Sequence, residues 1–448
     1  MRGFNTLLFV LFALSANAAD GTLGTVSVQK GNNVSVNGEA PLSLTLDGKD
    51  HQSCQFLSKR APDESHEFTW KEVTTTRGGE LAEILGDQLR SVDSLVVKGN
   101  VNDKDFHAMW DASLYGYLSV INLKNAVLEN NAVPDTAFFH ENEQYEGSSH
   151  EIFYYIGLRK IILPEGLEKI GEGAFYQASA LRQVNFPSTL RYIGDFAFNA
   201  TKLEMNQLVI PEGVEEINQY AFAFCRKLKA QVILPSTIKK IGEWAFYGCP
   251  ITSINLPEGL ESLGSLAFWD CDLREVSIPS SCHEFNEGWQ FGFNRNLEKM
   301  HLPEGMTEIP DHFAVDCFRL REVNFPHTLK HIGEKAFSLC ISLKNVELPL
   351  GMQSLGEEAF SELEALEQIV FPASMKSLGK NSCSYWKNIK RIYCAAMEPP
   401  VCDPTDGGVF SGFDFPDGLN TPVVYVPKGS INKYKDTSRN CMGWEKFW

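Results

Sequence analysis

The sequence predicts a repeat solenoid that carries a parallel β-sheet along one side. An aliphatic or aromatic residue followed by proline recurs at intervals of 22 to 24 residues, at Pro164, Pro187, Pro211, Pro235, Pro257, Pro279, Pro303, Pro326, Pro349 and Pro372. Phrases such as IGEGAF at Ile170 and IGEKAF at Ile332 recur between these prolines, and an apolar triplet of fixed spacing comes before them. One unit of this size cannot bury its own apolar face, whereas stacked units bury a continuous one.

Each part of the unit has a physical reason. In a triplet such as Leu181, Val184 and Phe186, the last two side chains point to one side of the chain, which indicates a short strand with one buried face. Proline ends that strand because it cannot donate the next ladder hydrogen bond. A Glu-Gly pair follows four of the prolines and predicts a bend with positive φ, at Gly166, Gly213, Gly259 and Gly305. In the Ile-Gly-x-x-Ala-Phe phrase we expect glycine to supply a second corner, alanine to allow close backbone approach and phenylalanine to fill the interior.

The whole pattern, LP-x-x-L-x-x-IG-x-x-AF-x-x-C-x-x-L-x-x-V-x-LP, resembles the BspA-type leucine-rich repeat of bacterial surface proteins, the LRR_5 class. The resemblance implies a right-handed leucine-rich repeat superhelix, with the parallel sheet on one face and short irregular or 3-10 segments on the other. It also implies a cap at each end. The tail, with VYVP and a terminal GWEKFW, is similar to that of such proteins from Bacteroidetes and is suited to cover the last apolar layer.

The chain divides into five segments. Residues 1–18 combine Arg2, an apolar run and a small-x-small site, which is typical of a cleaved secretory signal peptide. Residues 19–60 alternate and form either a β-rich or a disordered segment. Residues 61–157 should hold a cap helix over LAEILGDQL and degenerate repeats, residues 158–394 the leucine-rich repeats and residues 395–448 the C-terminal cap. The degenerate repeats are indicated by two more triplets, Val92, Leu95, Val97 and Leu118, Ile121, Leu123.

The formal net charge of −17 argues against nucleic acid and anionic lipid as partners, because both require a basic surface. After the signal, no stretch of the sequence is long and apolar enough for a transmembrane helix. We therefore expect an exported protein, located in the periplasm, at the cell surface or outside the cell.

The 11 cysteines include no CxxC pair. Coils about 5 Å apart would allow disulfides, so oxidised pairs and metal ligands compete with a column of buried free thiols, which we favour. The column follows the repeat phenylalanine by three or four residues and consists of Cys225, Cys249, Cys271, Cys317 and Cys340. Cys383 takes the position of the phenylalanine itself. One disulfide among Cys394, Cys402 and Cys441 in the tail is a further alternative.

The sequence contains no HExxH, GxSxG or P-loop motif. Its many glutamates include those of the Pro-Glu-Gly corners, where a solvated side chain is the default. The sequence therefore predicts a protein that is not an enzyme and has no cofactor or metal site.

The outward positions of the strands form two columns and are the candidate binding surface. Amide, aliphatic, charged and aromatic groups in register suit contact with protein or glycan, although a solvated face without a partner is the simpler alternative. The candidates are Asn185, Gln207, Gln231, Asn255, Ser277, His301, Asn324, Glu347, Arg391 and Tyr393.

These observations favour a monomeric exported scaffold that binds another protein, or mediates adhesion, through the sheet face. The resemblance implies the same class of function, with a host matrix protein or a cell-surface component as the partner. The alternative is a surface protein that captures glycans without catalysis. Tyr393, Trp244 and Trp269 would then stack on sugars, although the two Trp flank the repeat phenylalanine and are better placed to cover the core.

Overall fold

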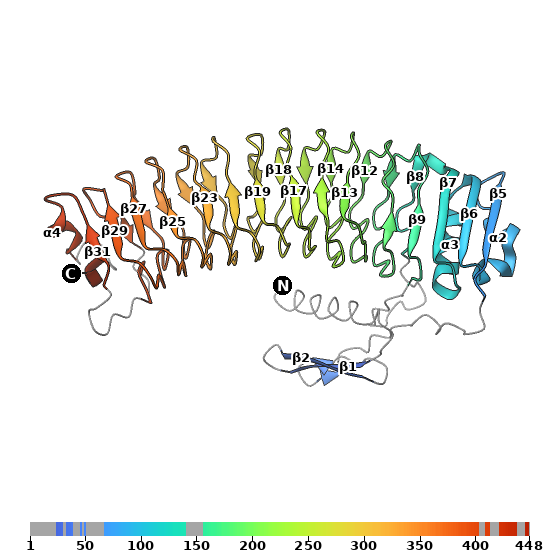
Figure 1. Ribbon diagram of the computed structural model, residues 1–448, viewed down its shortest axis with the longest axis horizontal. Helices are drawn as coiled ribbons and strands as arrows, with labels where there is room; N and C mark the ends of the chain where they lie inside the picture. The colour runs from blue at the N-terminus through green and yellow to red at the C-terminus, as the bar shows by residue number, and fades with distance from the viewer. Residues whose placement is uncertain are drawn as a thin grey trace. The chain divides into compact units, whose positions relative to one another are not determined.

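The computed structural model describes residues 67–139, 156–402, 408–412, 421–436 and 444–447, together with the backbone of four strands nearer the N-terminus. The chain forms two compact units: unit 1 comprises residues 1–205, 211–214 and 220–228, and unit 2 comprises residues 206–210, 215–219 and 229–448. The described residues from 67 onward form a stretch of parallel β-solenoid in each unit, which confirms the predicted fold class (Figure 1). The predicted signal peptide, residues 1–18, lies outside the described residues.

Within residues 19–60, whose structure the sequence left open, the backbone forms four strands. They pair as two antiparallel ribbons, β1 (Gly24–Gln29) with β2 (Asn33–Gly38) and β3 (Thr45–Leu46) with β4 (Lys49–Asp50).

Unit 1 contains a five-stranded parallel sheet and a second, shorter row of strands. The sheet order is β11 (Gln183–Val184), β9 (Lys160–Ile162), β7 (Val120–Leu128), β6 (Ser94–Val101) and β5 (Trp70–Thr75). The second row consists of β8 (Ala132–Val133), β10 (Lys169–Ile170) and β12 (Tyr192–Ile193), also parallel. Both degenerate triplets, in or beside β6 and β7, are at most 1% exposed, so these strands use the same buried face as the regular coils.

Helices accompany the first strands of unit 1. The helix expected from residue 81 begins there, but its α-helical part, α2 (Leu81–Leu85), is followed by the 3-10 helix η2 (Gly86–Ser91). A longer helix, α3 (Asp103–Tyr115), was not predicted, and a short 3-10 helix, η3 (Glu129–Asn131), follows β7. The sequence did contain a signal for α3, because Phe106, Met109, Trp110 and Leu114 have helical spacing and are buried.

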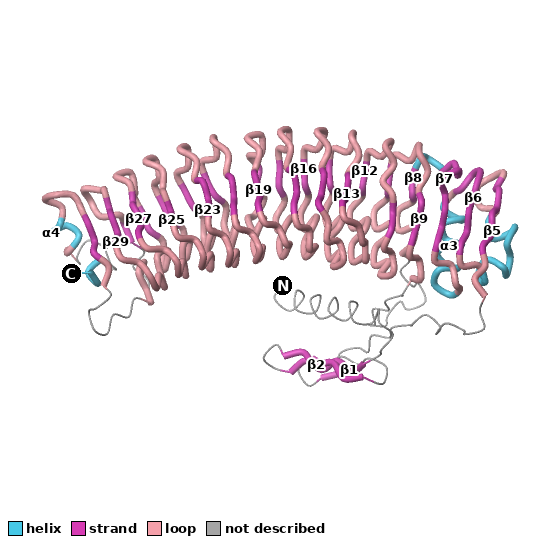
Figure 2. The backbone as a smooth tube through the Cα atoms, in the orientation of Figure 1, coloured by secondary structure: helices cyan, strands magenta, loops and turns pink. Residues whose placement is uncertain are grey.

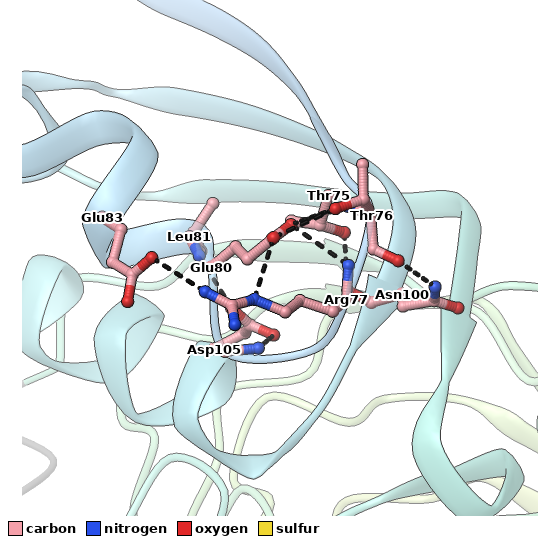
Figure 3. Close-up of polar contacts among 9 residues, drawn as sticks. Thr75, Thr76, Arg77, Glu80, Leu81, Glu83, Asn100 and Asp105 are labelled. Carbon is pink, nitrogen blue, oxygen red and sulfur yellow. Dashed lines mark hydrogen bonds and ion pairs between the residues drawn. The ribbon is translucent and has the colours of Figure 1, made fainter.

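A buried carboxylate ties α3 to the turn before α2. Asp105 is 1% exposed, and its carboxylate accepts hydrogen bonds from three backbone N–H groups: those of Gly79 (2.7 Å), Leu81 (3.0 Å) and Asn102 (3.0 Å). The bond from Asn102 is one half of a capping box at the start of α3. One side chain thus holds both helices of this region (Figure 3).

A second carboxylate closes the turn between β5 and α2. The Glu80 carboxylate accepts hydrogen bonds from the backbone N–H groups of Arg77 (3.1 Å) and Thr76 (2.7 Å), and the Arg77 guanidinium donates to it as well (3.1 Å). Figure 3 shows these groups converging on one side chain. The two backbone donors lower the pKa of Glu80, because they stabilise its charged form.

Unit 2 presents its longer strands as one face and a second row of two-residue strands beside it (Figure 2). The face comprises three sheets of parallel strands: β13 (Gln207–Val209), β15 (Gln231–Ile233) and β17 (Ser253–Asn255); β19 (Glu275–Ser277), β21 (Lys299–His301) and β23 (Glu322–Asn324); and β25 (Asn345–Val346), β27 (Gln368–Phe371), β29 (Arg391–Cys394) and β31 (Val423–Tyr425). The second row comprises β14 (Glu216–Ile217), β16 (Lys240–Ile241), β18 (Ser262–Leu263), β20 (Glu284–Phe285), β22 (Glu308–Ile309), β24 (His331–Ile332), β26 (Ser354–Leu355), β28 (Ser377–Leu378) and β30 (Val401–Cys402).

The end of unit 2 is closed by a short helix and aromatic side chains. The helix α4 (Ile431–Tyr434) follows β31, and the 3-10 helix η6 (Trp444–Phe447) follows it. The Tyr434 hydroxyl donates to the carbonyl of Ala396 at 2.8 Å, and Trp444 is fully buried. The last layer of the core is therefore covered by large side chains from the tail.

The repeat phenylalanines form the centre of the core. In unit 1 the rings of Phe138, Phe175, Phe198 and Phe222 stack in succession, with centroids 5.2 to 5.3 Å apart. In unit 2 the pairs Phe246–Phe268 (5.6 Å), Phe268–Phe291 (5.5 Å) and Phe337–Phe360 (5.8 Å) are also stacked. Each ring thus contacts rings of adjoining coils, which a single coil could not provide.

The repeat glycines stand at two corners of the coil, as expected, but glycine is required at each for a different reason. The glycines of the Glu-Gly corners do adopt positive φ, for example 98° at Gly305. In the Ile-Gly phrase, however, the positive φ lies two residues after the glycine, as at Phe196 (55°). A Cβ on Gly264 would lie 2.4 Å from the backbone nitrogen of Glu243, so this glycine is required because adjacent coils approach closely.

The corners after the prolines alternate between two kinds: a Glu-Gly corner in one coil is hydrogen-bonded by a corner with a Ser or Thr hydroxyl in the next coil. The N–H of Gly305 donates to Oγ1 of Thr328 (3.0 Å), and that hydroxyl donates to the carbonyl of Met306 (2.9 Å). The His327 N–H donates to the Glu304 carboxylate (3.1 Å). The same bonds join Glu165 and Gly166 to Ser188 and Thr189, and Glu258 and Gly259 to Ser280 and Ser281. The polar corners therefore repeat every two coils, although the apolar pattern repeats every coil.

Candidate binding face

Pleating places alternate residues of each face strand outward. In β15, for example, Val232 is fully buried, whereas Gln231 before it is exposed and Ile233 after it is half-buried. Parallel pairing then sets the outward side chains side by side, since Gln231 of β15 pairs with Ser253 of β17 and Ser277 of β19 with His301 of β21. The predicted outward columns are therefore present within each sheet.

The ten candidates fall in different places. Asn185 belongs to unit 1 and follows β11, whereas the other nine belong to unit 2. His301 and Tyr393 are half-buried, and the remaining candidates are exposed. The candidates of unit 2 are distributed over all three face sheets, so the structure does not gather them into one pocket.

The three asparagines are engaged by the backbone of the preceding coil. The Asn324 side chain accepts from the N–H of Leu302 (2.8 Å) and donates to its carbonyl (3.0 Å). Asn185 makes the same pair of bonds with Leu163, and Asn255 makes it with Leu234. Both polar ends of each amide are therefore used in holding coils together, which is a structural role.

Several other polar groups of the face pair with each other. The Gln207 side-chain amide donates to that of Gln231 (3.2 Å), and His301 Nε2 lies 3.3 Å from a Glu275 carboxylate oxygen. One column further along, Lys299 Nζ lies 3.4 Å from the carboxylate of Glu322. These side chains are therefore already paired within the face.

The last sheet of the face has a different chemistry. Arg391 and Tyr393 lie on β29, and Tyr393 is flanked in register by Val370 of β27 and Tyr425 of β31. Sequence reasoning identified the VYVP strand but did not include Tyr425 among the candidates. The signal was available, because Val423 and Tyr425 are separated by one residue, as Arg391 and Tyr393 are.

The charged residues directly before β25, β27 and β29 form ion pairs with each other. Glu367 accepts hydrogen bonds from Lys344 (3.0 Å) and Lys390 (3.1 Å), which come from the coils on either side. Both ammonium groups lower the pKa of the Glu367 carboxyl, Lys344 most strongly, because they stabilise its charged form. Arg391 takes no part in this cluster.

The repeat pattern matches a known family over more than half of the chain. The family described as "BspA type Leucine rich repeat region (6 copies)" matches residues 148–232, 229–330 and 312–397. The chain belongs to this BspA-type leucine-rich repeat family. No curated protein matches its sequence.

Solved structures resemble this leucine-rich repeat chain in part. A leucine-rich repeat protein from Bacteroides ovatus is 22% identical, with a TM-score of 0.37, covering 53% of this chain and 79% of the other. A leucine rich cell surface protein from Faecalibacterium prausnitzii is 20% identical, with a TM-score of 0.34, covering 63% and 84%. The leucine rich repeat protein of T. pallidum is 29% identical, with a TM-score of 0.33, covering 36% and 77%. The family assignment rests on the sequence match.

The cysteines of the predicted column are buried thiols that form no disulfide among the described residues, as expected. Cys225, Cys271, Cys317 and Cys340 each donate to a backbone carbonyl of the preceding coil at 3.2 to 3.3 Å. Asn294 makes an equivalent bond to Phe268 in the corresponding position (2.7 Å). The column therefore adds hydrogen bonds between adjoining coils in the buried interior. Cys383, Cys394 and Cys402 are also buried and form no disulfide among the described residues, whereas Cys441 lies outside them.

The tryptophans of the alternative glycan hypothesis are covered by other rings. Trp244 lies 4.4 Å from Tyr247, and Trp269 packs against Trp289 (5.2 Å) and Phe293 (4.5 Å). Both tryptophans are half-buried. They contribute to packing outside the sheet, as their position beside the repeat phenylalanine suggested.

Among the described residues, no group of three or more His, Cys, Asp or Glu side chains is arranged to hold a metal ion. Within the same part of the chain, no helix has the length and apolar character needed to cross a membrane.

Proposed function

We propose that this chain is an exported, non-catalytic scaffold that binds a protein partner through the sheet face of unit 2. The observation that carries the proposal is the composition of the two outward columns. They contain three carboxylates, Glu275, Glu322 and Glu347, against two cations, Lys299 and Arg391, in a chain with a net charge of −17. The acidity of the chain thus lies mostly elsewhere, which leaves a nearly neutral face for contact.

Apolar side chains on this face favour protein over glycan. Val209 and Val370 are about half exposed, at 50% and 47%, although each stands on a regular strand. Aliphatic groups gain from burial against another apolar surface but cannot bind sugar hydroxyls. Protein interfaces combine such groups with aromatic and arginine side chains, which this face also carries.

We also propose that the protein is exported and that its binding serves adhesion. The signal-like residues 1–18 support export, and a host matrix protein or another cell-surface component is the partner class to examine first. The face strands supply a long series of equivalent positions, so partner choice would depend on the outward side chains rather than on the fold.

The test is a binding measurement with the full mature chain immobilised for surface plasmon resonance. Purified extracellular-matrix proteins are passed over the wild type, over Val209→Asp on the face and over Lys227→Asp, an exposed lysine outside the face strands. Saturable binding that is weakened by Val209→Asp or by changes elsewhere on the face, but not by Lys227→Asp, supports the proposal. Absence of saturable binding to matrix and cell-surface proteins, or equal binding by every face variant, would refute it.

A further inference from the structure

The outward side chains of the last three face strands include aliphatic, aromatic and arginine groups in register, and we name this group the C-terminal patch. It consists of Val370 on β27, Arg391 and Tyr393 on β29, and Val423 and Tyr425 on β31. Val370 pairs with Tyr393 and Tyr393 with Tyr425, while Arg391 pairs with Val423. Two rows of the patch are thus fixed by strand register.

The two tyrosines are adjacent in one row and form a stacked aromatic pair. Their rings stack with centroids 4.7 Å apart and an angle of 12° between planes. Tyr425 is 47% exposed and Val423 is 53% exposed, on the last strand of the sheet. Tyrosine offers a large contact area with few rotatable bonds, so ordering it in an interface costs little conformational entropy.

Arg391 distinguishes the C-terminal patch from the rest of the face. Lys299 occupies the same column and already lies 3.4 Å from the Glu322 carboxylate. Arg391 is exposed, and in the described part of the chain no carboxylate lies within ion-pair distance of its guanidinium. Its five donors are therefore available to a ligand, and a carboxylate is the group that matches their planar fork.

The central face has no comparable combination. There the asparagines bind backbone groups of the preceding coil, and Gln207 with Gln231 and His301 with Glu275 satisfy each other. Only the C-terminal patch places two half-exposed aliphatic groups, a tyrosine pair and an available guanidinium on adjacent described strands. Tyrosine and arginine are also the residue types that dominate binding energy in protein interfaces.

We infer that the C-terminal patch is the principal contact site for a polypeptide that presents a carboxylate flanked by apolar side chains. This inference rests on the proposed function and names its site and the chemistry of its partner. The carboxylate receives the Arg391 guanidinium, while the flanking side chains cover Val370, Val423 and the tyrosine pair. Charge complementarity selects the ligand, and burial of the apolar groups supplies most of the affinity.

A phage-displayed library of random linear peptides, selected on the immobilised full chain, tests this inference. Selected peptides should share an aspartate or glutamate beside aliphatic or aromatic residues. Synthetic versions should bind the Arg391→Glu and Tyr425→Ala variants at least about tenfold more weakly. A peptide in which lysine replaces the acidic residue should regain affinity for Arg391→Glu, because the charges are then exchanged. Lys299→Glu is the matched control, since it makes a similar charge reversal in the same column and should leave affinity unchanged.

The other outcomes separate the two proposals. Peptides without an acidic residue, failure to select any peptide, or equal binding by wild type and Arg391→Glu would overturn the assignment of the C-terminal patch. If binding were weakened by Val209→Asp but not by Arg391→Glu, the face would remain the binding surface and the patch assignment would fail. Tyr425-dependent binding to neutral glycans alone, or self-association abolished by Arg391→Glu, would assign the patch to a sugar or to a second copy and would also overturn it.

Discussion

Replacing Asp105 with alanine should selectively destabilise the start of the solenoid. The carboxylate is 1% exposed and accepts three backbone N–H groups, from Gly79, Leu81 and Asn102. The bond to Leu81 is buried and the other two are partly buried. Losing one buried charge-assisted bond at about 2 to 3 kcal/mol, and two bonds that water partly replaces at about 1 kcal/mol each, gives about 4 kcal/mol.

Hydrogen exchange followed by mass spectrometry is the appropriate assay, because a repeat protein can open locally without unfolding throughout. A loss of about 4 kcal/mol corresponds to roughly a thousandfold faster exchange of amides that open with this region. The increase should be confined to peptides covering α2 and α3, with peptides from unit 2 as the internal reference.

Asp103→Ala is the matched control for that variant. Asp103 is exposed in the same first turn of α3 and carries the same charge. Its loss removes only a favourable interaction with the helix N-terminus, worth less than about 1 kcal/mol. Equal effects of the two variants would show that Asp105 stabilises the region merely through helix charge and would refute the argument from its three bonds.

Three further predictions concern the contacts between coils. Thr328→Val keeps the side-chain shape but removes the corner hydroxyl, and should lower the free energy of unfolding by about 1 to 2 kcal/mol in urea denaturation, whereas Thr307→Val should have little effect. Hydrogen bonds from adjoining coils lower the pKa of Glu304 and Glu367. A carboxyl group with a lowered pKa stabilises the folded state at pH values above its ordinary pKa of 4.5, and this stabilisation is lost as the pH falls through the pKa of the folded state. The thermal midpoint should therefore drop in acid, and it should drop less steeply when Glu304 and Glu367 are both changed to Gln. Burial raises the pKa of the Cys317 thiol to about 12, so iodoacetamide should label Cys317 only in denaturant; peptide mapping that finds Cys317 labelled in the native chain would contradict its buried position.

The sequence predicted which side chains lie on the candidate binding face, but not which of them are available to bind a partner. Alternation along each strand identified which residues point outward, and Arg391 and Tyr393 were among them. Alternation could not show that the Asn324 side chain is hydrogen-bonded to the backbone N–H and carbonyl of Leu302 in the preceding coil, because these bonds depend on how two coils pack against each other. For the same reason, Lys299 and Arg391 looked equivalent in sequence, although only Lys299 has a carboxylate neighbour among the described residues.

For the fold, too, the sequence determined some features and only the tertiary structure determined others. The recurring proline and the Ala-Phe phrase by themselves determined a stacked solenoid with buried phenylalanines, because apolar periodicity is a local property that each unit repeats. The role of the glycine in the Ile-Gly phrase was decided only by tertiary structure, since the atom that a Cβ on Gly264 would strike belongs to the preceding coil. Packing between coils likewise decided that corners close in pairs and that the cysteines donate to neighbouring carbonyls. Sequence therefore determined what each coil buries, and the contact between coils determined which polar groups remain for a partner.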